Sequence, residues 1–469
     1  MFKVSLPQIF KIVVALVVGI VLSQLPLAAG LERSSMIYVG VFIAMVVLMA
    51  AKAVPDFVAV LAACGTLVIF KVGALTEVFA PFAGGTVWQI ISILAFAVAA
   101  QKGSLLSLIT LNVLKPFKPT YMGQVAAVMT AITILNFMIP SSFAKVAMLA
   151  PVVINICDHC GYKKNSKEAA GLLIAVFIPA IQCSFAFTTG STAWSYMIGF
   201  MQTETFHPTF TFTSWLASTW VWVVVMMVGT YLFIGLFNRP KDGGLVNKEF
   251  VNDTIAKLPP LTAKDKINAV ILLVSIVLWM TESLHGLNGI GITIVAVFFY
   301  FVTGILTPQE FKANVDWPTV MLIGGILCLA GFTSTLGLSD VLANLLGPVA
   351  EVITSHIAVM IIVVCIITFV LRYVFVSNAP IILVVCAALL PVLFGKSIHP
   401  FVLVFTLHQI GACFQTSYNY ILLPPVYPLT QDRLAEHKAL VPYAYAYPVI
   451  CTLGLLASIP MWNSLGYLG

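Results

Sequence analysis

The stretch that decides the fold is IPSSFAK, residues 139–145, in the middle of the apolar segment 120–157. A proline and two serines interrupt a run that is otherwise apolar enough for a membrane helix. Non-helical backbone at membrane depth is tolerated only where protein buries it or a watery cavity borders it. We therefore predict a re-entrant hairpin that enters and leaves the membrane on one side, with this stretch at its tip.

A second apolar segment, 355–395, is also interrupted near its middle, by VSNAP at 376–380. Each hairpin precedes another apolar segment with small polar residues, FTTGST at 187–192 and FQTSYN at 414–419. This repeated order predicts an inverted repeat. Transporters of that kind bind substrate where their discontinuous helices meet at the midplane. Ser, Thr and Gly also serve helix packing in membranes, and for any single residue that alternative stays open.

The composition agrees with a membrane protein. Of 469 residues, 61% are hydrophobic and only 9% are Asp, Glu, Lys or Arg, against about 25% charged residues in soluble proteins. Such a chain has too little polar surface to cover a soluble core. We predict an all-α polytopic protein, with two hairpins and eleven transmembrane helices over residues 10–29, 36–51, 56–72, 87–101, 170–200, 215–237, 267–285, 288–305, 317–336, 401–423 and 442–463.

Lys and Arg prefer the cytoplasmic side of short loops, and this rule tests the topology. If the N-terminus is cytoplasmic, all but five of the 23 basic residues lie on the cytoplasmic side; the five are Arg33, Lys71, Lys145, Arg372 and Lys396. Making either hairpin a full crossing would invert every later loop. We therefore predict a multi-pass protein of the inner (plasma) membrane, with its C-terminus outside and a cytoplasmic connector at 238–266.

Other classes of function find little support in the residues. Cys157, His159 and Cys160 are too few for the usual four-ligand zinc site, and we find no catalytic dyad. The net charge of +6 comes without a basic run that carries interleaved aromatics. We therefore expect no metal, no cofactor, no nucleic-acid partner and no enzymatic activity.

At the two hairpin tips and the broken helices, the chain resembles the divalent-anion:sodium symporter family of dicarboxylate, citrate and sulfate carriers. In that family each tip carries a Ser-Asn-Thr motif. Here Ser377 and Asn378 match the second motif, with Ala379 in place of Thr, while the first keeps only Ser141 and continues with Ser142 and Phe143. Asp316-Trp317, followed by Gly324-Gly325, extends the resemblance over most of the chain.

The resemblance implies a homodimeric elevator-type secondary transporter, with lipid around it and a small anion, such as a C4–C5 dicarboxylate, as substrate. It divides the chain into a fixed scaffold (1–119 and 267–350), transport parts (120–237 and 351–469) and the connector. The substrate-binding residues that it implies, together with our own reading of the basic residues, are Ser141, Ser142, Lys145, Thr189, Gly190, Arg372, Ser377, Asn378, Thr416 and Ser417. In sodium-coupled members, the positions of Ser141, Ser142, Gly190, Ser377, Asn378 and Thr416 would hold sodium.

Lys145 bears on the coupling mode. It lies four residues past Ser141 in an apolar half-helix, where a charge costs about 2.5–3.5 kcal/mol unless it faces a cavity or a partner. The chain resembles sodium-independent exchangers of the family, which have a basic residue at this place. A fixed ammonium would supply the charge of a sodium ion without leaving. The alternative is that Lys145 snorkels to the membrane interface.

The leading hypothesis is therefore a sodium-independent dicarboxylate exchanger. The alternative is a sodium-coupled symporter of a dicarboxylate, tricarboxylate, sulfate or sulfonate. Arg372 is a second basic group that can clamp a carboxylate, or else it points outward or pairs structurally. His408 is either a proton-coupling group or a packing residue. A channel would require a continuous polar pore, which the clustered polar residues do not provide.

Overall fold

The computed structural model describes residues 6–26, 31–139, 141–191, 193–201, 210–240, 252–253, 255–256, 258–338, 355–373, 375, 378–416, 420 and 422–468. Every regular element within these ranges is helical. Ser377 and Ser417, two of the predicted site residues, lie outside the described residues, as does Pro140 of the first predicted tip.

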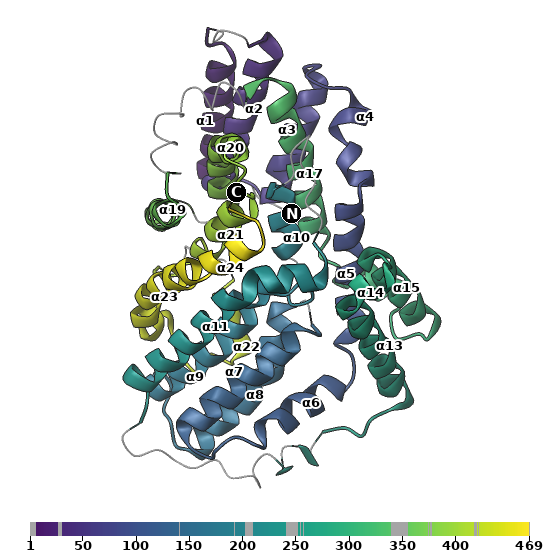
Figure 1. Ribbon diagram of the computed structural model, residues 1–469, viewed down its shortest axis with the longest axis vertical. Coiled ribbons are helices and arrows are strands. Elements are labelled where there is room, and N and C mark those ends of the chain that lie inside the picture. Colours follow the sequence, from purple (N-terminus) through teal and green to yellow (C-terminus); the bar gives the residue numbers. More distant parts are fainter. Residues whose placement is uncertain are drawn as a thin grey trace.

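Helices α1 (Leu6–Ser23), α2 (Arg33–Ala50), α3 (Asp56–Ile69) and α17 (Trp317–Thr335) pack together in the upper part of Figure 1. Close contact depends on glycines, because a Cβ at Gly19 would lie only 2.8 Å from the Cβ of Ala44. Small residues let membrane helices approach each other in this way. The outer surface of α1 remains exposed and apolar, as a lipid-facing helix requires.

A second cluster of packed helices contains α5 (Gly85–Ala100), α13 (Ala263–Met280) and α15 (Gly289–Val302). Short helices adjoin these elements. They are α4 (Leu75–Val78), the 3-10 turn Ala80–Ala83, α14 (Glu282–His285) and α16 (Pro308–Asn314).

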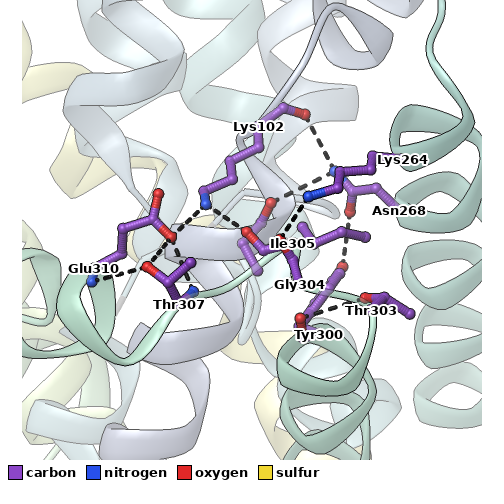
Figure 2. Close-up of polar contacts among 10 residues, drawn as sticks. Lys102, Lys264, Asn268, Tyr300, Thr303, Gly304, Ile305, Thr307 and Glu310 are labelled. Atoms are coloured by element: carbon purple, nitrogen blue, oxygen red, sulfur yellow. Dashed lines mark hydrogen bonds and ion pairs between the residues drawn. The ribbon is translucent and has the colours of Figure 1, made fainter.

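Helix α5 bends by 75° into α6 (Leu105–Leu114), a helix that we did not predict within residues 102–119. Figure 2 shows the polar network at this bend. The side-chain amide of Asn268 donates to the carbonyls of Ala100 and Lys102, both at 3.2 Å, and so caps the end of α5.

Lys102, just after the end of α5, donates to the Ile305 carbonyl and pairs with Glu310 at 2.5 Å. Gly103 has a φ of +82°, and Asp265 fills the space beside its Cα. The bend is thus fixed to α13 and α16.

Helices α7 (Tyr121–Asn136) and α8 (Ser142–His159) form an antiparallel pair with the IPSSFAK break at one end. At the other end, the Tyr121 ring contacts the Tyr162 ring at 5.9 Å between centroids, and the Tyr121 hydroxyl donates to the Glu168 carbonyl at 2.8 Å. The geometry is that of a helical hairpin. That this pair enters and leaves a membrane on one side stays a prediction.

The broken helix that follows lies in the interior of the protein. Helix α9 (Lys167–Phe177) continues as a π-turn (Ile178–Gln182) and a 3-10 turn (Ser184–Ala186), and the chain resumes as α10 (Ala193–Met201). The segment Lys167–Ala186 is entirely buried inside the protein, whereas only 11% of α1 is buried. This burial satisfies the requirement that irregular backbone be shielded from lipid.

The remaining helices extend from the centre of Figure 1 towards its left side, and α20 lies higher, below α1 and α2. They are α11 (Phe212–Phe237), α19 (Ile357–Leu371), α20 (Ala379–Gly395), α21 (Phe401–Ile410), α22 (Val426–Leu429), α23 (His437–Ala457) and α24 (Ile459–Ser464). Helix α21 packs on α19, α20 and α23, and α11 packs on α23. Helix α10 contacts both α17 and α21, so it lies between the two groups of helices.

The described helices can be compared with the predicted membrane crossings. Among the described residues, five helices are long and apolar enough to cross a membrane, or six if the bent α5–α6 pair is one span. Several of the observed helices are shorter than the predicted spans. In the predicted span 401–423 the helix ends at Ile410, and in the predicted span 170–200 the α-helix ends at Phe177. The eleven crossings and the division into fixed and moving parts stay predictions.

Candidate functional site

Ser141 begins the second helix of the first hairpin. Its side chain accepts a hydrogen bond from the Ala144 backbone N–H at 3.3 Å, and so caps α8. A serine at this position satisfies one of the four N–H groups that a helix leaves unpaired at its start. The neighbouring Ser142 hydroxyl lies 3.2 Å from the Ser184 hydroxyl of the broken helix. Ser141 therefore caps its own helix, and Ser142 connects the hairpin tip to the broken helix.

Lys145 lies one turn into α8 and is fully buried. Its ammonium nitrogen is 2.5 Å from Asn136 Oδ1 and 2.6 Å from the Gly190 carbonyl oxygen. The side chain therefore points into the protein, and the alternative in which it snorkels to the interface is wrong. Hydrogen bonds to two oxygen atoms offset part of the cost of burying the charge.

The loop that receives Lys145 depends on Gly190. A Cβ at this position would lie 2.6 Å from the Ser184 carbonyl oxygen and 3.0 Å from that of Asn136. The hydroxyl of Thr189 donates to the Asn136 carbonyl at 3.0 Å. The predicted residues Ser141, Ser142, Lys145, Thr189 and Gly190 thus lie in one cluster, with Asn136 at its centre.

The second hairpin supplies Asn378, which begins α20. Its amide nitrogen donates to the carbonyls of Leu407 and His408 at the end of α21, both at 3.4 Å. Gly411 lets this approach happen, because a Cβ there would collide with the Asn378 amide. Thr416 lies in the break after α21 and is partly buried.

Arg372 ends α19 and is only 1% exposed. Its guanidinium donates to the Phe375 carbonyl at 2.7 Å. The side chain therefore does not reach the surface of the protein, which excludes the outward-pointing alternative. Arg372 lies five residues before Ser377, just as Asn136 lies five residues before Ser141.

The two broken segments meet, and Gln182 joins them. Its amide nitrogen donates to the Ala412 carbonyl at 2.9 Å, and its amide oxygen accepts from the Tyr420 hydroxyl at 3.2 Å. Nearby, the Phe185 ring contacts the buried His408 ring at 4.5 Å between centroids. His408 therefore packs against an aromatic side chain, whatever further role it has.

Sequence reasoning missed Asn136, Gln182 and Ser184. Asn136 and Ser184 hold the tip of the first hairpin, and Gln182 connects the two halves. The repeated five-residue spacing before each tip serine was a signal for Asn136. For Gln182 and Ser184 the sequence carried no such signal, because their partners lie far away along the chain.

The family model described as the sodium:sulfate symporter transmembrane region matches residues 6–425. The chain belongs to this family. Its members are membrane transporters and not enzymes. The predicted resemblance to the divalent-anion:sodium symporters is therefore confirmed.

Relatives of this chain include dicarboxylate transporter 1 of chloroplasts from Spinacia oleracea, 21% identical over 71% of this chain, and its counterpart from Arabidopsis thaliana, 21% identical over 69%. The matched part spans 59% of the length of each of these relatives. A protein of Cupriavidus necator described as a membrane protein is 25% identical over 41% of this chain and 39% of its own length.

The fold also resembles that of the YdaH transporter of Alcanivorax borkumensis. The two chains superpose with a TM-score of 0.60 over 99% of each, at 14% sequence identity. At that identity the likeness concerns the fold alone.

Proposed function

We propose that this transporter exchanges small dicarboxylates across the membrane without sodium. The observation that carries the proposal is the buried Lys145 ammonium, hydrogen-bonded to the Gly190 carbonyl and to Asn136 Oδ1. Carbonyl and amide oxygens at the tip of a discontinuous helix are typical sodium ligands in secondary transporters. In this chain the Lys145 nitrogen donates hydrogen bonds to two oxygens of this kind.

A lysine at that place has a mechanistic consequence. Its ammonium has three N–H donors, and the oxygens of Asn136 and Gly190 accept from two of them. For the third, the described part of the chain supplies no partner, and in this proposal it binds a carboxylate of the substrate. Because the lysine is covalently attached, its charge stays when the substrate leaves. An empty carrier would have to move this buried positive charge without a bound anion to compensate it, which is costly. The carrier therefore returns more easily with another dicarboxylate bound.

Two further features support a dicarboxylate. The chloroplast relatives are named as dicarboxylate transporters, and Arg372 is a second buried basic group beside the second broken segment. A planar guanidinium binds a carboxylate through two parallel hydrogen bonds. We include in the proposal a homodimer with an elevator motion, located in the plasma membrane with a cytoplasmic N-terminus.

Sodium-coupled symport is the second candidate. The description of the family model names sodium and sulfate, and the hydroxyls of Ser141, Ser142 and Thr416 are suitable sodium ligands. In this alternative, sodium would bind beside the lysine and not in its place.

The deciding experiment measures uptake of labelled succinate by the purified protein in proteoliposomes. Vesicles are either empty or loaded with unlabelled succinate, and each is tested with and without an inward sodium gradient. We expect uptake only into loaded vesicles, at a rate independent of sodium. Sodium-dependent uptake into empty vesicles would overturn exchange. Competition by malate, 2-oxoglutarate, citrate and sulfate then identifies the substrate class.

A further inference from the structure

A cavity of about 310 Å³ lies beside the Lys145 cluster but does not contain the hairpin tips. Its walls come from the start of α5, the 188–189 loop and α10, the start of α11, and the α13–α15 region. The 188–189 loop leads directly into Gly190, whose carbonyl Lys145 binds. The cavity, here called the α5–α10 cavity, therefore borders the loop that Lys145 binds. Its volume is within the usual range for small-molecule sites, about 300–1,000 Å³.

Three buried or half-buried side chains of the α5–α10 cavity have unused hydrogen-bond donors. They are the amide of Gln89, the hydroxyl of Thr188 and the indole N–H of Trp194, for none of which the described part of the chain supplies a partner. Trp194 is only 2% exposed, and a buried N–H without a partner costs about 1–3 kcal/mol. A ligand or water that enters the cavity would satisfy this group.

Most other polar groups of the cavity are already occupied. The exception among the described residues is the exposed Asn288, whose Oδ1 caps α15 while its amide nitrogen is unused. Thr189 donates to Asn136, Thr293 donates to the Gly289 carbonyl at 2.8 Å, and Glu282 accepts from the Gly289 N–H at 3.2 Å. Glu282 is the only acidic side chain among the described residues that line the cavity, and one of its oxygens is engaged in this way. The unused groups are thus uncharged, and each can donate to an anion.

We propose that the α5–α10 cavity is the access route of the dicarboxylate on one side of the membrane, and that Gln89, Thr188 and Trp194 are specificity-determining residues that bind its carboxylate in transit. This inference rests on the proposed function. Uncharged donors suit this role, because passage requires binding that is favourable but weak, and a fixed charge would retain the anion. The charged group, Lys145, lies beyond the loop. The cavity lies at the start of α5 and of α11, and the predicted topology places both of these helix starts on the outer side of the membrane.

The first test measures cavity access by thiol labelling and does not depend on transport. Gln89→Cys is compared with Leu284→Cys, an 83% exposed position on α14 that does not line the cavity. Each is labelled with an anionic (sulfonatoethyl) and a cationic (trimethylammonioethyl) methanethiosulfonate. We expect the ratio of anionic to cationic rates at position 89 to exceed that at 284 by about tenfold, and succinate to slow labelling only at 89. Faster labelling by the cation at 89, or no labelling there, would overturn the proposal. The unmodified chain gives the background, since eight of its nine cysteines are buried.

The second test uses Trp194→Phe, which removes the N–H and keeps an aromatic ring. We expect the KM for succinate presented at the cavity face of oriented vesicles to rise about tenfold, with the KM at the opposite face within twofold of the unmodified value. Trp88→Phe, at a 52% exposed position on α5, is the matched control. An equal rise at both faces, or none at either, contradicts the proposal.

The two proposals fail separately. If the unmodified protein carries no dicarboxylate while position 89 still prefers the anionic reagent, the proposed function has failed and the anion route stands. If exchange is measured but position 89 shows no preference, only the α5–α10 cavity proposal falls.

Discussion

Lys145 is a single residue whose surroundings decide how the transporter is expected to work. A lysine in an apolar helix can reach the membrane interface, pair with an acid, or donate to carbonyls. Here it donates to the Gly190 carbonyl and to Asn136 Oδ1 from a fully buried position. The nitrogen is therefore held at the loop between the two parts of the broken helix.

Lys145→Ala should lower sodium-free succinate exchange at least about tenfold, since a hydrogen bond to a charged group contributes about 1.5–3 kcal/mol. The vacated oxygens of Gly190 and Asn136 are suitable for sodium, so sodium should restore part of the rate. Exchange by loaded proteoliposomes in choline and in sodium buffers measures both effects. Lys163→Ala, at an exposed lysine, is the control. A sodium-free rate equal to that of the unmodified protein would remove Lys145 from the mechanism.

Gly190→Ala should lower exchange by a similar factor, because the added Cβ would lie 2.6 Å from the Ser184 carbonyl oxygen and must displace the loop that Lys145 binds. Gly65→Ala on α3 is the matched control, since its Cβ would meet no atom within 4 Å. Ala is also the better helix former at that position, by about 1 kcal/mol. Exchange rates are compared for protein that elutes as a single folded species. Equal rates for the two variants would show that the loop tolerates displacement.

At the scale of elements, the polar network of Figure 2 ties the end of α5 to α13 and α16. Glu310 accepts from Lys102 and Thr307, and these hydrogen bonds lower the pKa of its carboxyl to about 2, from an ordinary value of 4.5. A carboxyl whose pKa is lower in the folded state stabilises the fold above its unfolded pKa. That contribution is lost as the pH falls from about 4.5 towards 2.

The Glu310→Gln variant should therefore have a lower Tm than the unmodified protein at pH 7 and pH 5, and the difference should shrink as the pH falls below about 4.5. Thermal unfolding in detergent at pH 7, 5, 4 and 3 measures the difference. Glu32→Gln is the control, because Glu32 is exposed and forms no ion pair with the described residues. A Tm difference that is constant down to pH 3 would mean that the carboxylate charge is not what stabilises the bend.

At the scale of the whole molecule, the α7–α8 pair determines the topology of everything that follows it. The structure places Tyr121 beside Tyr162, so the two ends of the pair lie together. If the pair is re-entrant, exposed Lys118 and Lys164 share one side of the membrane, and the charge rule places Leu284 on the other.

Impermeant thiol reagents applied to cells should therefore label Leu284→Cys, whereas Lys118→Cys and Lys164→Cys should react only after the membrane is opened. All three positions are exposed. Labelling of Lys118→Cys and Lys164→Cys from opposite sides would show that the pair crosses the membrane and would invert the topology after it. The unmodified chain again supplies the background.

The sequence alone determined the class of protein and the breaks in its helices, and it singled out Lys145 as a candidate site residue. Each of these follows from local chemistry, because apolar composition, prolines and small polar residues act on the segment that contains them. Ser141 also follows locally, since a capping serine bonds to an N–H only three residues away. Arg372 lies five residues before Ser377 at the second tip, and Asn136 lies five residues before Ser141 at the first. This repeated spacing is a further sequence signal, and it indicates Asn136.

Only the tertiary structure decided where the Lys145 ammonium points, because Asn136 and Gly190 come from two other segments, nine and 45 residues away. The same holds for Gln182, whose partners Ala412 and Tyr420 lie 230 and 238 residues along the chain. The bend after α5 and the α5–α10 cavity also form between distant segments. Hydrogen bonds and cavities of this kind depend on how separate helices pack, and a local pattern carries no information about that packing.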